Sequence, residues 1–187
     1  MSLTFKYDIE KTIAALAYLI QQENGKLDMF LSLKMLYLAD KQAFVCWGKT
    51  ITGDSFASLP KGPVLRKTYD LFKGTGTARE LKEWNSYFSE KVNNSIQLLR
   101  TPNIERLSER EMVVLEKARE EVNSCAPWEV AKWLHETCPE WSNPRGSSRP
   151  IDPVVILRNA GRTEDEIKLI EESTEVFNRL EKVFGAL

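Results

Sequence analysis

The chain has a single histidine, His135, and two of its three cysteines lie near it in the sequence. Cys138 follows His135 by about one helical turn, and Cys125 precedes it. These side chains could share a zinc ion, or a thiolate could act as a nucleophile with the imidazole as its base. A structural zinc site needs a fourth ligand, and the sequence names no oxyanion donor for a nucleophile. We therefore expect a half-buried, hydrogen-bonded histidine, no metal and no cofactor.

Three aspartates, Asp40, Asp54 and Asp70, form the second candidate set because they flank one central segment. If they gathered around a divalent metal ion, they could support phosphodiester chemistry. The competing interpretation gives each a local role: Asp40 partners a backbone N–H or Lys41, Asp54 belongs to the turn after Gly53, and Asp70 is a helix-surface charge near Lys67 or Lys73. We favour the local roles and expect no enzyme, since nuclease sites usually add a Lys or His in tight register. A metal-dependent nucleic-acid-processing enzyme remains the alternative.

Five tryptophans exceed what a plain helical bundle needs. Trp128 and Trp133 are five residues apart, so they point about 140° apart on a regular helix. One of them is therefore expected at the surface or against a separate layer. Exposed aromatic side chains are enriched at protein–protein contacts.

Composition bounds the class of protein. The chain has 187 residues, 42% of them hydrophobic and 28% charged, with a net charge of −1. Its apolar runs are shorter than the roughly 20 residues of a membrane span, so we expect a cytoplasmic protein with no membrane partner. The net charge argues against nucleic acid as the main partner. Seven basic residues against three acidic ones between Lys49 and Lys82 leave a DNA-binding autoregulator as a further alternative.

The segment that must position these residues is a very apolar helix followed by a constrained loop. Residues 28–47 have almost no polar face, which predicts a buried central helix that ends at Gly48. Gly53, Gly62 and Pro63 then restrict the backbone of the loop. We expect Pro63 to lie early in the next helix.

Other helices are predicted from their end signals and periodicity, and a hairpin is predicted around Asn93-Asn94 between residues 84 and 100. A short strand is predicted at residues 55–59, and the remaining helices at 8–24, 108–123, 127–138, 152–161 and from 163 onward. Together these predict a mainly α (α+β) fold. It would be a single-domain helical bundle around the buried central helix, with a small antiparallel β-hairpin or sheet.

Several motifs together resemble the Panacea domain of SocA-like antitoxins and GepA-like phage-associated proteins. Residues 33–40 (LKMLYLAD) resemble its central helix, and GKTITGD at 48–54 and KGPV at 61–64 resemble its loops. Tyr69-Asp70 and the later Leu107-Ser108-Glu109, Trp128, His135 and Trp141 follow the same pattern. Trp47 and Pro60 depart from it. The resemblance predicts a single domain over residues 1–187, with a core at about 30–141 and a helical extension at 151–187.

The resemblance implies a non-enzymatic, intracellular antitoxin that binds a cognate toxin directly and, in the SocA-like case, delivers it to a cellular protease. It leaves a homodimer open. We expect the partner to be contacted by Lys61, Gly62, Pro63, Arg66 and Lys67. We expect the loop to be organised by Asp40, Gly53, Asp54, Tyr69 and Asp70.

Overall fold

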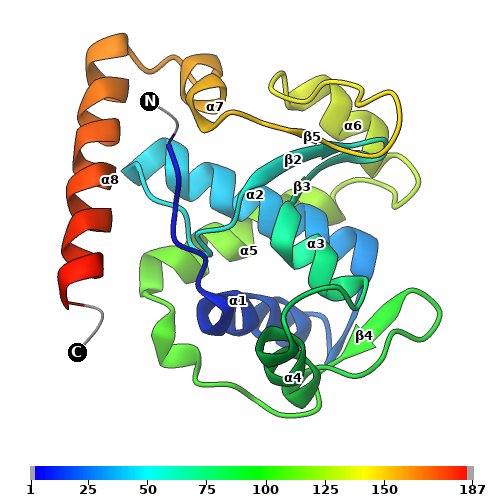
Figure 1. Ribbon diagram of the computed structural model, residues 1–187. Helices are drawn as coiled ribbons and strands as arrows, with labels where there is room; N and C mark the ends of the chain where they lie inside the picture. The colour runs from blue at the N-terminus through cyan, green and yellow to red at the C-terminus, as the bar shows by residue number, and fades with distance from the viewer. Residues whose placement is uncertain (1–2, 185–187) are drawn as a thin grey trace.

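The computed structural model describes residues 3–184. Over that range the fold is mainly helical with small antiparallel sheets, which confirms the predicted fold class (Figure 1). The helices are α1 (Ile9–Gln22), α2 (Met29–Trp47), α3 (Arg66–Phe72), α4 (Ala78–Tyr87), the 3₁₀ helix η1 (Ile104–Arg106), α5 (Glu109–Asn123), α6 (Val130–Thr137), α7 (Pro153–Asn159) and α8 (Glu164–Phe184). The strands are β1 (Lys26–Asp28), β2 (Phe56–Leu59), β3 (Gly62–Leu65), β4 (Ser95–Gln97) and β5 (Arg149–Pro150).

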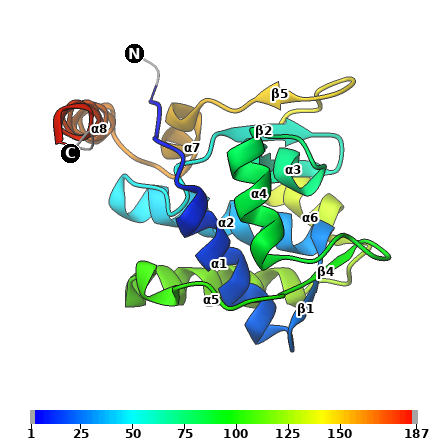
Figure 2. The same cartoon turned by 60° about the horizontal axis from the view of Figure 1, so that its bottom comes forward.

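Helix α2 runs through the middle of the molecule, as its apolar sequence predicts. It lies between α5 on one side and the β2–β3–β5 sheet on the other (Figure 2). Asp28 caps its first turn by accepting hydrogen bonds from the N–H groups of Phe30 and Leu31. Gly48 ends it with a φ of 69°, a conformation that suits glycine. The predicted bounds of the central helix are therefore confirmed.

The strand predicted at residues 55–59 is present as β2, but residues 62–65 form a second strand, β3, where the start of a helix was expected. Phe56 pairs with Leu65 and Leu59 with Gly62, so β2 and β3 form a hairpin whose turn is Pro60-Lys61. The prediction that Pro63 begins a helix is wrong, because α3 starts only at Arg66. Strand β3 is at the edge of its sheet, where proline's missing N–H donor is tolerated.

The second sheet is a pair of distant segments, β1 and β4, with Leu27 opposite Ile96. Asn93 and Asn94 have φ values of 48° and 61°, as a tight hairpin turn requires, and Val92 bridges to Ser95 around them. The predicted turn is thus confirmed. The sequence analysis missed α4, which precedes this turn and begins with a Thr77–Glu80 capping box.

Helix α8 lies at the edge of the molecule, beside α7 and the N-terminal segment (Figure 1). Its anchors are in its first half. Ile170 packs on Gly48, where an added Cβ would lie 3.0 Å from the Ile170 side chain. Arg162, just before the helix, donates to the carbonyl of Val45 at 2.8 Å. Within residues 3–184, none of the helices is both long enough and apolar enough to cross a bilayer.

Candidate functional site: a basic groove beside a braced loop

The loop that joins α2 to β2 is held from beneath by Asp40, which is 1% exposed. Its Oδ1 accepts hydrogen bonds from the N–H of Ile51 at 2.9 Å and of Thr52 at 3.1 Å. The Thr52 hydroxyl donates to Oδ2. Burial raises the pKa of Asp40 to about 7, against the lowering effect of these donors. Asp40 therefore fixes the backbone of the loop from the core of the protein.

Asp54, at the end of the same loop, ties it to α3. One carboxylate oxygen accepts from the N–H of Lys67 at 2.9 Å, and the other from the N–H and the hydroxyl of Thr68, both at 2.8 Å. The two N–H groups belong to the first turn of α3, where the helix itself provides no acceptor for them. Burial raises the pKa of this carboxyl as well. Both aspartates thus bond to backbone groups of the loop and of α3, as the interpretation that gave them local roles predicted.

Gly53 brings the loop against the N-terminal segment. It has a φ of 69°, and a Cβ added there would lie 1.9 Å from the carbonyl oxygen of Lys6. No real side chain tolerates that distance. The loop and residues 6–8 are therefore in direct backbone contact, and Asp8 donates its N–H to the carbonyl of Thr52 at 2.8 Å.

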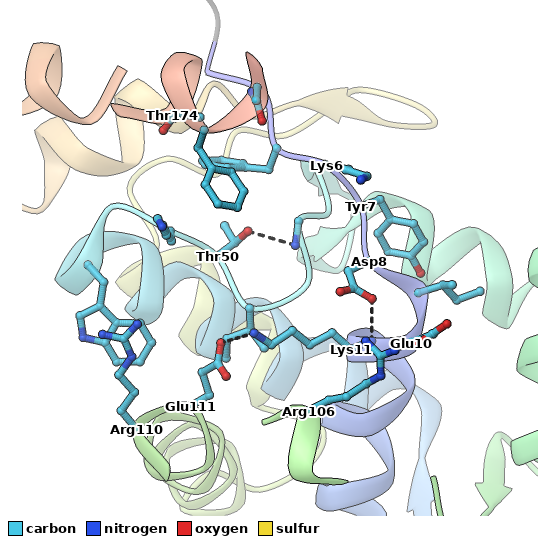
Figure 3. Close-up of a pocket in the computed structure, with 18 of the residues that line it drawn as sticks. Lys6, Tyr7, Asp8, Glu10, Lys11, Thr50, Arg106, Arg110, Glu111 and Thr174 are labelled. Atoms are coloured by element: carbon cyan, nitrogen blue, oxygen red, sulfur yellow. Dashed lines mark hydrogen bonds and ion pairs between the residues drawn. The ribbon is translucent and has the colours of Figure 1, made fainter. Parts of the chain in front are cut away.

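A groove of about 670 Å³ opens where these two segments meet (Figure 3). One wall is the braced loop from Lys49 to Gly53, and another is the N-terminal segment leading into α1. The start of α5 with Arg106 of η1 forms the third wall, and Thr174, Phe177 and Asn178 of α8 complete it. Segments from both ends of the chain thus enclose one site.

The lining of the groove is predominantly basic. Its cationic residues outnumber its acidic residues six to three: Lys6, Lys11, Lys49, Arg79, Arg106 and Arg110 against Asp8, Glu10 and Glu111. All three acids are engaged. Glu111 pairs with Lys11 at 2.7 Å, Glu10 pairs with Arg106, and Asp8 caps α1.

Two of the cations lie on aromatic rings. Lys49 Nζ is 4.6 Å from the ring centre of Phe177, and the Arg110 guanidinium is 4.6 Å from that of Trp47. Among residues 3–184, neither cation forms an ion pair with a carboxylate. Ring contacts orient a cation and leave its outward N–H donors free. The groove is therefore suited to carboxylate or phosphate groups of a partner.

The predicted contact residues around the β2–β3 turn do not form one surface. Gly62 and Pro63 are buried, so their predicted contact with a partner is corrected to a role in shaping the turn. Lys61 is exposed at the turn. Arg66 and Lys67 lie beyond the other end of β3, so that Arg66 is roughly 16 Å along the strand from Lys61 at about 3.3 Å per residue.

Arg66 and Lys67 are also engaged within the chain. Arg66 pairs with Asp70 at 2.9 Å and lies 5.9 Å from the ring centre of half-buried Tyr69. Lys67 Nζ is 4.7 Å from the ring centre of Tyr7 and 3.7 Å from a carboxylate oxygen of Glu80. These two cations are therefore less available to a partner than Lys49 and Arg110 of the groove.

The β2–β3 turn is held from the core by a buried lysine. Lys34 is 1% exposed, and its Nζ donates to the carbonyl of Pro63 at 2.9 Å. The indole N–H of Trp141 donates to the carbonyl of Leu59 at 2.9 Å. The His135 ring stacks on the Trp141 ring, with 3.6 Å between the ring centres. Burial lowers the pKa of Lys34 to about 7. His135 serves here as a packed side chain.

We expect Lys34→Met to remove a pH dependence of stability. The lysine pKa is about 7 in the folded protein and 10.5 ordinarily, so between these values the unfolded chain binds more protons. The contribution of Lys34 to stability is therefore present at high pH and is lost as the pH falls toward 7. Urea unfolding from pH 7 to 10 should show a rise in the wild type that is flattened in Lys34→Met. Lys132→Met, at a position 79% exposed, should keep the rise. An unchanged rise in Lys34→Met would contradict the assignment.

The candidate catalytic sets do not assemble as the alternatives required. Within residues 3–184, no three His, Cys, Asp or Glu side chains are placed to hold one metal ion. Asp40 and Asp54 point to separate backbone donors, and Asp70 pairs with Arg66. Cys138 is buried, and burial raises the pKa of its thiol to about 11, which disfavours a thiolate.

Sequence reasoning found the loop but missed the groove. Trp47 and Lys49 flank the GKTITGD motif, which was a usable signal. Nothing local to the sequence connects Arg110 or Phe177 to that loop, because only the tertiary fold brings them there. Trp128 is 82% exposed, as expected for one of the tryptophan pair, but it lies away from the groove lining.

Comparison with known proteins gives one match. A family model described as "Antitoxin SocA-like, Panacea domain" matches residues 33–142. No curated protein and no solved structure matches the chain. The matched residues contain α2 from Leu33 onward, the braced loop and the β2–β3 turn, whereas α8 and the N-terminal wall of the groove lie outside them.

Proposed function

The chain belongs to the family of SocA-like antitoxins with a Panacea domain, and on this premise we propose that it neutralises a cognate toxin by binding it directly. The family match is the observation that carries the proposal, since it extends over more than half of the chain. The match ends near Trp141, which helps to hold the β2–β3 turn. The matched residues therefore include Asp40, Asp54, Lys34 and Trp141, the side chains that hold the loop and the β2–β3 turn.

We propose the basic groove as the main docking surface for the toxin. Lys49 and Arg110, which form no ion pair with a carboxylate within residues 3–184, would donate hydrogen bonds to acidic groups of the partner, and Trp47 and Phe177 would supply apolar contact beneath them. Aromatic and arginine side chains contribute most of the energy at many protein interfaces. Lys61 at the β2–β3 turn remains a candidate for a peripheral contact.

The proposed role requires no covalent bond to be formed or broken. Asp40, Asp54 and Lys34 are engaged in holding backbone groups, which supports a structural role for each. The runner-up, a metal-dependent nucleic-acid-processing enzyme, draws its support from Asp40, Asp54 and Asp70, and these are not gathered around a common space. We therefore propose a binding protein rather than an enzyme.

Co-expression with the product of the neighbouring gene tests the function. We expect that product to arrest growth when expressed alone and to be harmless beside this chain. A product that is harmless alone, or toxicity that this chain leaves untouched, would defeat the proposal. The amount of toxin in rescued cells distinguishes the two modes: direct blocking leaves it unchanged, whereas delivery to a protease lowers it.

Charge reversal locates the surface. The double variant Lys49→Glu, Arg110→Glu should weaken toxin binding by roughly tenfold to a hundredfold, because it places repulsion where an acidic group docks. Arg66→Glu with Lys67→Glu should have a smaller effect, and Lys132→Glu should have none. Isothermal calorimetry with the purified pair measures all three, and thermal melting checks that each variant is folded. A larger loss at Arg66 and Lys67 would move the surface to α3.

A further inference from the structure

Helix α8 carries an apolar stripe that no other part of residues 3–184 covers. Leu169, Val176, Leu180 and Val183 are 65%, 54%, 50% and 65% exposed. With exposed Ser173 they recur at alternating spacings of four and three residues, the seam pattern of a coiled coil. Apolar residues that are exposed together on one face indicate an interaction surface, whereas scattered single ones do not.

The stripe points away from the body of the protein. The side of α8 that packs inward holds Ile167 and Thr174, which are buried, and Ile170 against Gly48. At 100° per residue, the centre of the stripe lies about 130° around the helix from that side. Both views place α8 at the edge of the molecule, with its outer side facing away from the other elements (Figures 1 and 2).

We propose that this stripe pairs with the same stripe of a second copy, as an antiparallel two-helix coiled coil. In the register that packs Leu169 against Leu180 of the partner subunit, Ser173 meets Val176 of the partner subunit. Two-fold symmetry repeats both layers. Small Ser173 opposite β-branched Val176 lets the helices approach in the middle of the seam.

Charge complementarity selects this occupant and this orientation. Glu172 and Arg179 flank the stripe on the same side, one heptad apart. The antiparallel register above brings Glu172 beside Arg179 of the partner subunit, and symmetry makes this pair twice. In a parallel pair, Glu172 and Arg179 would each lie beside the residue five positions further along the partner helix. Those residues are apolar, so no ion pair would form there. Arg179 now pairs with Glu175 of its own helix, and both side chains are exposed enough to exchange partners.

The stripe covers only residues 169–183, so we expect the association of the two copies to be weak. Its few layers bury less than the roughly 800 Å² per partner of a standard stable interface. We therefore expect a reversible dimer whose population rises with concentration. Helix α8 also forms one wall of the basic groove, but the stripe residues Leu169, Ser173, Val176, Leu180 and Val183 do not line it, so we expect this association to be separable from the proposed toxin binding.

Sedimentation velocity of the intact chain over a wide concentration range tests the pairing. We expect a monomer–dimer equilibrium in the wild type. Leu180→Glu should weaken it by at least about a hundredfold, because symmetry places the charge in two layers. Val113→Glu, at an exposed apolar position on α5 (67%, against 50% for Leu180), is the matched control and should leave the equilibrium unchanged. A wild type that stays monomeric throughout, or a dimer indifferent to Leu180→Glu, would overturn the proposal.

A charge swap tests the antiparallel register. Glu172→Arg and Arg179→Glu should each weaken the dimer by roughly tenfold, since each sets like charges against each other twice. The double variant Glu172→Arg, Arg179→Glu restores the opposite charges and should recover wild-type association. Single variants without effect, or a double variant weaker than both singles, would overturn the register. Unchanged toxin neutralisation by these variants is expected, and its loss would assign the stripe to the toxin instead.

Discussion

Replacing Gly53 with alanine is expected to destabilise the protein by roughly 3 kcal/mol or more, the largest effect of a single methyl group in this fold. The new Cβ would lie 1.9 Å from the carbonyl oxygen of Lys6, which is a backbone atom and cannot rotate away. The loop and the N-terminal segment would have to separate. Because both line the groove, toxin binding should fall together with the midpoint of urea unfolding.

Gly25→Ala provides the matched control. Gly25 has a φ of 84° and nothing within 4 Å of an added Cβ, so alanine there meets conformational strain alone. That strain costs about 1–2 kcal/mol. If the two variants lost the same stability, the loss at Gly53 would be due to backbone conformation, and the close approach of the N-terminal segment would be refuted.

Asp40→Ala should cost about 3–5 kcal/mol, because it leaves the N–H groups of Ile51 and Thr52 and the Thr52 hydroxyl without their acceptor in the core. Asp40→Asn keeps one carbonyl oxygen for the backbone donors and should cost about 1–2 kcal/mol. Asp165→Ala, at an exposed aspartate of α8, should stay within about 0.5 kcal/mol of the wild type. Urea unfolding of the three variants measures the order, and a loss at Asp40 no larger than at Asp165 would contradict the bracing role.

The same residue predicts a pH dependence. The pKa of Asp40 is about 7 in the folded protein and 3.8 ordinarily, so between these values the folded protein binds more protons. The stability that Asp40 contributes is therefore fully present below pH 4 and is lost as the pH rises toward 7. Asp40→Asn does not titrate. The difference in unfolding free energy between wild type and Asp40→Asn should therefore shift in favour of Asn as the pH rises from 4 to 7.

The elements that sequence reasoning found are those whose ends have local chemistry. Asp8, Asp28 and Asp152 cap the helices that they were expected to begin, and Gly48 ends α2. The errors arose where local chemistry is ambiguous. Pro63 suits both a helix start and an edge strand, and only the pairing of β3 with β2 decides between them.

Helix α4 was missed because it has few apolar residues, and Trp84 is the only one of its residues that is buried. Its Thr77–Glu80 capping box was a signal that could have been used. The pairing of β1 with β4 joins residues about 70 positions apart, and a three-residue strand has no sequence pattern that names such a partner.

The candidate site was half predictable. The motif around Gly53 and the loop role of Asp40 depend on short-range geometry, and both could be inferred from the sequence. The burial of Gly62 and Pro63 could not, because it depends on Lys34 of α2 and Leu134 of α6 closing beneath the turn. The groove itself needs η1, α5 and α8, which no single segment of the sequence suggests.

The hydrogen bond from the Asn178 side chain to the carbonyl of Thr4 spans 174 positions of the chain. During synthesis, the first of these residues leaves the ribosome long before the last, so the central helix can fold while the groove still lacks its α8 wall. Binding competence would then appear only after α8 has been synthesised and has packed against the N-terminal segment. A nascent chain stalled before α8 would have the family core and no complete docking site.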